Sequence, residues 1–333
     1  MTRTKLILIG LIVLTLTLTA CFATDPTAPT PNPDSLAVTD PPGGLAATHP
    51  LSIAMLRDRT YPGSDFVIEQ TLEPGINYNR YIASYLSDGL KIYALLTVPM
   101  SERPPTGYPV VIFNHGYIPP DEYRTTERYL AYTDAFARAG YIVVKSDYRG
   151  HGSSEGDPES AYTSPGYTVD VLNALAAARR YPDADPNRVG MWGHSMGGYI
   201  TLRAMVAEQG IRAGVIWAGV VDSYTDMLTT WFRRDWGDRM IGRYGSPQTN
   251  PDFWNAISAN SFLGDLSGPV QTHTGTGDAT VPYTMSVRLD EQIRAAGGTS
   301  ELFLWEGDDH NIATHRDDAL LLSVAFMHVH VRG

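Results

Sequence analysis

The segment Gly193-His194-Ser195-Met196-Gly197 joins two stretches of different character. Residues 188–192 before it form a short apolar run that predicts a buried strand, and residues 196–208 after it predict a helix closed by Gly210. Glycines two positions before and after the serine remove the Cβ atoms that would collide in a sharp strand-to-helix turn. This context predicts that Ser195 is an exposed nucleophile; the alternative is an inert serine in a tight turn.

Outward from Ser195, predicted strands and helices alternate along the chain. Short apolar runs predict strands at residues 110–113, 141–144, 188–192, 213–217, 269–274 and 301–305, and longer stretches between and after them predict helices at 127–139, 169–180, 196–208, 286–296 and 317–330. Such alternation is typical of a mostly parallel, doubly wound sheet with helices on both faces. The fold class predicted is therefore α/β.

Two regions depart from this alternation. Residues 66–72, 80–86 and 90–98 are rich in β-branched and aromatic side chains, and Asp88-Gly89 between the last two predicts a hairpin, so antiparallel strands precede the parallel ones. Residues 222–265 are too long for a plain loop and hold eight aromatic side chains. We expect a small cap of short helices there, with aromatic residues that pack it onto the body or line a substrate pocket.

A serine hydroxyl is a weak nucleophile, so it needs a general base that a third group orients. His310 follows the strand predicted at 301–305, and Asp278 follows the strand at 269–274 within a glycine-rich loop. Their order after Ser195 is acid and then histidine, the order expected for this kind of turn. The prediction is a triad of Ser195, Asp278 and His310.

Other residues could compete for these roles. Asp222 is an alternative acid, because it follows the strand predicted at 213–217. We expect solvated loop charges at Asp308 and Asp309, a capping or exposed side chain at His315, a packed ring at His273, and no site role for His328 and His330 in the last helix.

An oxyanion requires two preorganised N–H donors. The backbone N–H of Met196, directly after the nucleophile, is one expected donor. The loop after the strand at 110–113 should supply the other, where Gly116 allows close approach and the N–H of Tyr117 is the expected donor, with its phenol as the alternative. A structural role is expected for His115.

Five motifs together resemble the catalytic domain of the prolyl oligopeptidase family within the α/β-hydrolase superfamily, and are also similar to dienelactone-hydrolase-like esterases. They are Asn114-His115-Gly116-Tyr117, Asp147-Tyr148-Arg149-Gly150-His151-Gly152-Ser153-Ser154, Gly193-His194-Ser195-Met196-Gly197-Gly198, Gly277-Asp278 with Val281-Pro282, and Asp309-His310. The resemblance covers roughly residues 80–333. It implies an α/β-hydrolase fold, the triad Ser195, Asp278 and His310, a loop at 147–154 that borders the site, and a structural role for Arg149.

The sequence departs from the larger oligopeptidases in one respect. They carry an N-terminal β-propeller that excludes large substrates, and residues 51–108 leave no room for one here. The expected function is hydrolysis of an ester or a short peptide as a carboxylesterase or serine peptidase, and an aminopeptidase would need acidic groups such as Asp226, Asp235 or Asp238 to hold an ammonium. The alternative is a non-catalytic, lipid-anchored binding module.

Composition limits the partners of the 333-residue chain. Its 36 acidic and 25 basic side chains give a formal charge of −11, which disfavours nucleic acid because the mean field repels phosphate. No cluster of His, Cys and carboxylate residues has the spacing of a zinc site, so no metal and no other cofactor is expected.

The N-terminus predicts export. Arg3 and Lys5 precede an apolar run at residues 6–18 that is shorter than a membrane span, as in a signal peptide. Leu18-Thr19-Ala20-Cys21 resembles the bacterial lipobox, which implies cleavage before Cys21, the only cysteine, and its lipidation; plain cleavage near Ala20 is the alternative. The predicted organisation is a signal peptide at 1–20, a Pro/Thr-rich tether at 21–50 and a hydrolase domain at 51–333, anchored to the cell envelope by lipid.

Overall fold

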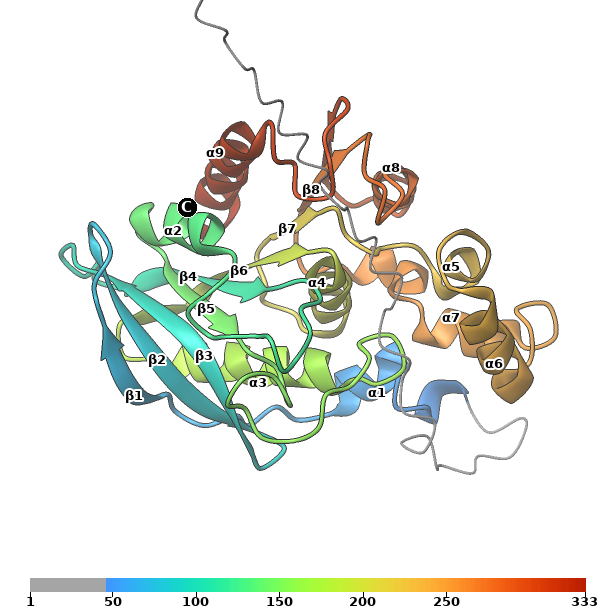
Figure 1. The fold of residues 1–333 in the computed structure, drawn as a ribbon, viewed down its shortest axis with the longest axis horizontal. Coiled ribbons are helices and arrows are strands. Elements are labelled where there is room, and N and C mark those ends of the chain that lie inside the picture. Colours follow the sequence, from blue (N-terminus) through green and yellow to red (C-terminus); the bar gives the residue numbers. More distant parts are fainter. Residues whose placement is uncertain (1–45) are drawn as a thin grey trace, which may run out of the picture. The chain divides into compact units, whose positions relative to one another are not determined.

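The computed structural model of the chain describes residues 46–333 (Figure 1). The signal peptide, Cys21 and most of the tether lie outside the described residues. None of the helices in this part of the chain is long and apolar enough to cross a membrane.

Nine strands form one sheet in the order β1-β2-β3-β5-β4-β6-β7-β8-β9. Their bounds are β1 Val67–Leu72, β2 Tyr78–Ser87, β3 Leu90–Pro99, β4 Tyr108–Asn114, β5 Ile142–Ser146, β6 Ala184–His194, β7 Gly214–Trp217, β8 Val270–Gly275 and β9 Ser300–Trp305. β1 with β2, β2 with β3 and β3 with β5 pair antiparallel. The other neighbours, from β5 through β4 and on to β9 in the sheet order, pair in parallel. The predicted mostly parallel sheet with an antiparallel lead-in is confirmed.

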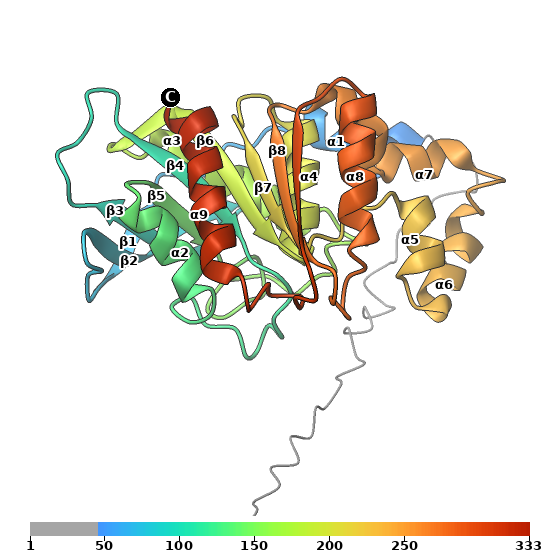
Figure 2. The same ribbon diagram turned by 90° about the horizontal axis from the view of Figure 1, so that it is seen from above.

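Side chains alternate between two apolar layers because successive residues of a strand point to opposite faces. On one face, Val111, Phe113 and Trp192 pack with α2 (Leu130–Arg138) and α9 (Arg316–Met327), which lie side by side in Figures 1 and 2. On the other face, Ile112 and Met191 pack with α3 (Gly166–Arg180), α4 (Met196–Ala207) and α8 (Thr284–Ala295). Both faces of the central strands are therefore buried, which explains their continuous apolar runs.

Between β7 and β8 the chain forms four short helical segments, in the region where we expect a cap. They are α5 Tyr224–Thr230, α6 Arg234–Tyr244, α7 Pro251–Ile257 and a 3-10 segment at Ala259–Asp265. Figures 1 and 2 show α5, α6 and α7 grouped at one side of the sheet, beyond α4 and α8.

The helices of the structure differ from the predicted ones at several places. The helix expected from residue 127 begins at Leu130, because Arg128 and Tyr129 both adopt left-handed backbone angles with φ of 54°. The last helix ends at Met327 and continues as a short π-helical turn, His328–Arg332. Short helices at Ala46–Thr48 and α1 (Ile53–Asp58) were not expected; the Ser52 side chain caps α1 by accepting the N–H of Met55.

Candidate active site

Ser195 occupies a strained turn between β6 and α4. Its φ of 55° and ψ of −118° lie outside the regions that L-residues ordinarily adopt, and strain of this kind gathers at functional sites. The flanking glycines are required by space: a Cβ on Gly197 would lie 1.9 Å from the carbonyl oxygen of Asn114, and one on Gly193 would lie 2.2 Å from that of Gly197. Ser195 retains partial exposure, whereas His194 and Met196 are buried.

Asp278 and His310 form a pair at the carboxyl ends of β8 and β9. His310 Nδ1 lies 2.7 Å from Asp278 Oδ2, and the Asp278 side chain is fully buried. The other carboxylate oxygen accepts the backbone N–H groups of Thr280 and Val281 at 2.7 and 2.9 Å. Because a carboxylate only accepts hydrogen bonds, His310 Nδ1 donates this one, and in the neutral ring Nε2 is then the nitrogen with the lone pair that a general base requires.

His194 brings this pair to the nucleophile turn. Its Nε2 lies 2.9 Å from the backbone oxygen of His310, and the centres of the two rings are 4.7 Å apart. Since Ser195 directly follows His194, the structure places His310 beside the turn that carries Ser195.

The loop after β4 also lies against this turn. A Cβ on Gly116 would meet the Tyr129 hydroxyl at 2.7 Å, His194 Nδ1 at 3.1 Å and the His194 carbonyl oxygen at 3.3 Å, so a side chain here would displace these neighbours. Tyr117 follows and is 43% exposed. Met196 is the first residue of α4, and a backbone N–H at this position of a helix has no carbonyl acceptor one turn earlier in the helix.

The alternative acid, Asp222, is engaged elsewhere. Its two carboxylate oxygens accept Nε and Nη2 of Arg288, each at 2.8 Å, and its side chain is buried. Asp222 therefore forms an ion pair with Arg288 of α8, whereas Asp278 is the carboxylate that is hydrogen-bonded to His310.

The histidines outside this pair have other contacts. His273 is buried and stacks on Phe303, and His115 stacks between Tyr123 and Tyr148. His328 and His330 lie in the terminal π-helical turn.

The expectation that Asp308 is a solvated loop charge is wrong. Asp308 is buried and accepts hydrogen bonds from the backbone N–H groups of Asp309, Thr314 and His315 and from His315 Nδ1, at 2.9–3.1 Å. Burial raises the pKa of this carboxyl, but the hydrogen bonds outweigh burial and lower it to about 2. Asp308 thereby fixes the loop that carries His310, a role that depends on the fold of residues 308–315.

The depressed pKa of Asp308 predicts a loss of stability in acid. The carboxylate stabilises the fold above its unfolded pKa of 3.8, and this contribution disappears as the pH falls through about 2. We expect Asp308→Asn to lower the free energy of unfolding by about 2 kcal/mol at pH 7 and the difference from wild type to shrink towards pH 2. Urea unfolding at pH 7, 4 and 2.5 measures this, with Glu306→Gln, an exposed carboxylate two residues earlier, as the control; a difference independent of pH would contradict it.

Arg149 is held within the loop at 147–154. Its guanidinium pairs with the buried carboxylate of Asp170 at 2.8 Å, and its backbone N–H donates to the same carboxylate. These contacts fix the loop to α3.

Aromatic side chains of the segment between β7 and β8, where we expect a cap, contact the rest of the chain. Trp231 donates from its indole to the carbonyl oxygen of Thr280, in the loop of Asp278, at 3.0 Å. Tyr162 contacts Trp231, Phe232 and Tyr199 of α4 through ring pairs 4.9–6.0 Å apart. The cap is thus tied to the acid loop and to the helix behind Ser195.

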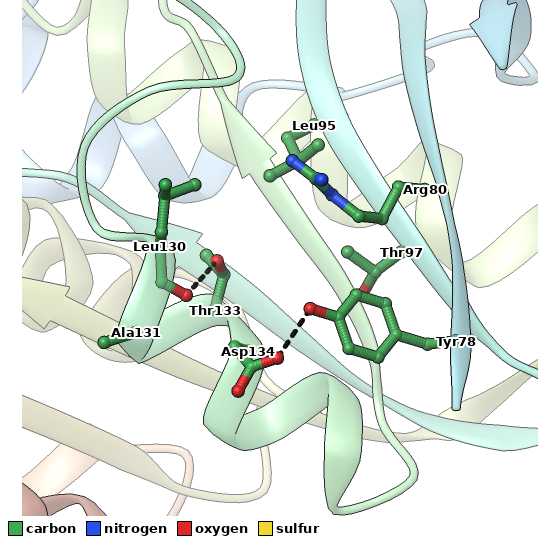
Figure 3. A pocket seen from close by; sticks show the side chains of 8 residues that line it. All are labelled: Tyr78, Arg80, Leu95, Thr97, Leu130, Ala131, Thr133 and Asp134. Atoms are coloured by element: carbon green, nitrogen blue, oxygen red, sulfur yellow. Dashed lines mark hydrogen bonds between the residues drawn. The ribbon is translucent and has the colours of Figure 1, made fainter. Parts of the chain in front are cut away.

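A hollow of about 280 Å³ lies elsewhere, between β2, β3 and α2 (Figure 3). It is lined by Tyr78, Arg80, Leu95, Thr97, Leu130, Ala131, Thr133 and Asp134, and the Tyr78 hydroxyl donates to Asp134 at 2.7 Å. None of the predicted catalytic residues lines this hollow. Across residues 46–333, no three His, Cys, Asp or Glu side chains gather in a way that could hold a metal ion.

Relatives in sequence support a hydrolase. The chain is 25% identical over 224 residues to the uncharacterized peptidase YtmA of Bacillus subtilis, which covers 66% of this chain and 82% of that protein. It is also 25% identical over 246 residues to a probable dipeptidyl-aminopeptidase B of Metarhizium robertsii, which covers 71% of this chain but only 26% of that protein. The chain therefore spans about a quarter of the length of this second relative.

A solved structure shares the fold. The acetyl xylan esterase from Paenibacillus sp. R4 matches with a TM-score of 0.64 at 16% identity, covering 83% of this chain and 91% of the esterase. This likeness confirms the α/β-hydrolase fold. The sequence model of the prolyl oligopeptidase family matches residues 128–331, which is more than half of the sequence. The chain therefore belongs to the prolyl oligopeptidase family.

Proposed function

We propose that this protein is a serine hydrolase that cleaves carboxylic esters through an acyl-enzyme on Ser195. The observation that carries the proposal is the 2.7 Å hydrogen bond between His310 and the buried Asp278 beside the strained turn of Ser195. A nucleophile, a base with a free lone pair and an orienting carboxylate are the groups that acyl transfer requires.

In the proposed mechanism His310 Nε2 accepts the Ser195 proton as Oγ attacks the substrate carbonyl carbon. The resulting oxyanion accepts the N–H groups of Met196 and Tyr117, with the Tyr117 phenol as an alternative donor. His310 then gives its proton to the leaving alcohol as the tetrahedral intermediate collapses to the acyl-enzyme. A water molecule, deprotonated by His310, then attacks the acyl carbon, and His310 returns this proton to Ser195 Oγ as the bond to the acyl group breaks and the acid leaves.

The cap charges favour an ester over a substrate with a free ammonium. Asp235 lies within 3.4 Å of Arg233 and Arg239, and Asp238 lies 3.9 Å from Arg234. Asp226 accepts the hydroxyl of Ser223 at 2.6 Å. Because guanidinium groups offset the charges of Asp235 and Asp238 on α6, these two of the three acidic residues that could serve an aminopeptidase supply little net negative potential.

Hydrolysis of paired substrates tests the proposal. The purified full chain is offered short-acyl nitrophenyl esters and, separately, aminoacyl and dipeptidyl nitroanilides, and a fluorophosphonate probes Ser195. We expect ester turnover and fluorophosphonate labelling. Amide turnover alone would replace the esterase by a peptidase, and silence in all three assays would favour a lipid-anchored binding module.

The proposed location is the outer side of a membrane, with a lipid on Cys21. The lipobox-like Leu18-Thr19-Ala20-Cys21 and the basic, apolar segment before it support this. We expect the wild-type chain, expressed in a bacterium, to incorporate an alkyne-tagged fatty acid and to sediment with membranes, and Cys21→Ser to lose both properties. Equal labelling of both chains would contradict lipidation at Cys21.

A further inference from the structure

A line of hydrogen bonds connects three loops of the candidate active site. The backbone N–H of Gly116 donates to the Tyr129 hydroxyl at 3.0 Å, and this hydroxyl lies 2.8 Å from His194 Nδ1. His194 Nε2 lies 2.9 Å from the backbone oxygen of His310. The line therefore runs from the loop of Tyr117, through the residue before Ser195, to the predicted base.

Chemistry allows one direction for these hydrogen bonds. A carbonyl oxygen only accepts, so His194 Nε2 carries the proton and Nδ1 has a lone pair. The Tyr129 hydroxyl must then donate to Nδ1 while its oxygen accepts the N–H of Gly116. Burial and the neighbouring His310 lower the pKa of His194 to about 3, so this neutral form holds at neutral pH.

Tyr129 is itself fixed from two sides. Its ring packs against Phe113 and Trp192 at centroid distances of 5.6 and 6.2 Å. The backbone before it is left-handed, and the buried Lys145 Nζ donates to the carbonyl oxygen of Glu127 at 2.8 Å and reaches that of Arg128 at 3.4 Å. A hydroxyl held this way has a defined position, as a supporting group for catalysis needs.

We propose that Tyr129 and His194 are positioning residues. They hold the loop of Gly116 and Tyr117, the turn of Ser195 and the base His310 in fixed positions relative to one another. The inference rests on the proposed function. Both residues act through Gly116 and His310, so their loss changes the placement of groups that contact the transition state. The effect should therefore fall on kcat, with KM little changed.

The first test compares two tyrosine-to-phenylalanine changes. Tyr129→Phe removes the hydroxyl that joins Gly116 to His194. Tyr78→Phe is the matched control, because its hydroxyl is also hydrogen-bonded and its ring buried, but at the hollow of Figure 3, which none of the predicted catalytic residues lines. We expect Tyr129→Phe to lower kcat and the rate of Ser195 labelling by a fluorophosphonate by about 10–100-fold, with KM within about twofold. The control should stay within about twofold of wild type in each quantity.

The second test uses His194. Phenylalanine removes both hydrogen bonds, whereas glutamine can accept from Tyr129 and donate to His310, so His194→Gln should recover part of the rate lost in His194→Phe. Adding Tyr129→Phe to His194→Phe should lower kcat little further, because His194→Phe has already removed the hydrogen bonds that connect Tyr129 to His310. If Tyr129→Phe does not fold, the comparison of His194→Gln with His194→Phe tests the positioning role by itself.

The outcomes separate the two proposals. A wild-type chain that neither turns over esters nor labels at Ser195 overturns both the proposed function and the positioning role. An active wild type with Tyr129→Phe equal to Tyr78→Phe, or with no difference between His194→Gln and His194→Phe, overturns the positioning role alone.

Discussion

Ser195→Ala is expected to lower kcat for ester hydrolysis by about 10⁵-fold or more and to abolish labelling by a fluorophosphonate. The alanine keeps the Cβ and therefore the same left-handed backbone at φ of 55°, so the change isolates the hydroxyl. Binding and the oxyanion donors remain, and a small residual rate above that of water should persist.

Ser101→Ala provides the control for this prediction, because Ser101 is exposed in the loop after β3. It should match the wild type in turnover, labelling and urea unfolding. Turnover by Ser195→Ala at the wild-type rate would remove Ser195 from the mechanism.

Asp278→Asn is expected to lower kcat by about 10⁴-fold with little change in fold. The carboxylate fixes the proton of His310 on Nδ1 through the 2.7 Å hydrogen bond, and an amide can instead present its N–H groups and reverse the tautomer. Steady-state kinetics with a nitrophenyl ester measures the loss, and circular dichroism checks the fold.

Asp222→Asn is the matched change at the alternative acid. It breaks the pair with Arg288 and should lower the free energy of unfolding by about 1–3 kcal/mol while leaving kcat within a few-fold of wild type. The reverse pattern, with Asp222→Asn inactive and Asp278→Asn active, would assign the acid to Asp222.

The sequence predicts the sheet and the Ser195 turn well because both have local causes. The continuous apolar runs of the parallel strands follow from burial on both faces, and the glycines around Ser195 follow from contacts of under 2.5 Å that any Cβ would make. The chain order of Asp278 and His310 places them after neighbouring strands, and parallel strands bring these positions to one edge.

The choice of the acid, the burial of Asp308 and the start of α2 depend on contacts that the local sequence does not indicate. Asp222 and Asp278 both follow strands, and only the position of Arg288 on α8 separates their roles. The burial of Asp308 depends on a loop that folds back over seven residues. The local sequence predicts that Tyr129 lies in a helix. The left-handed turn that excludes it from the helix is supported by Lys145, a strand residue 16 positions further along the chain, so the local pattern does not indicate the turn.

The hydrogen bond from Trp231 to Thr280 links the segment between β7 and β8 of this chain to the loop that carries Asp278, so an exchange of that segment also changes the support of the loop. A transplanted segment that replaces residues 223–265 removes the donor to the carbonyl oxygen of Thr280, two residues after Asp278. A chimera that retains an indole at this point should therefore inherit a working acid loop along with its new specificity, whereas one without it changes both at once. In this chain, an exchange of residues 223–265 that is meant to leave the Asp278 loop unchanged must therefore keep the indole of Trp231.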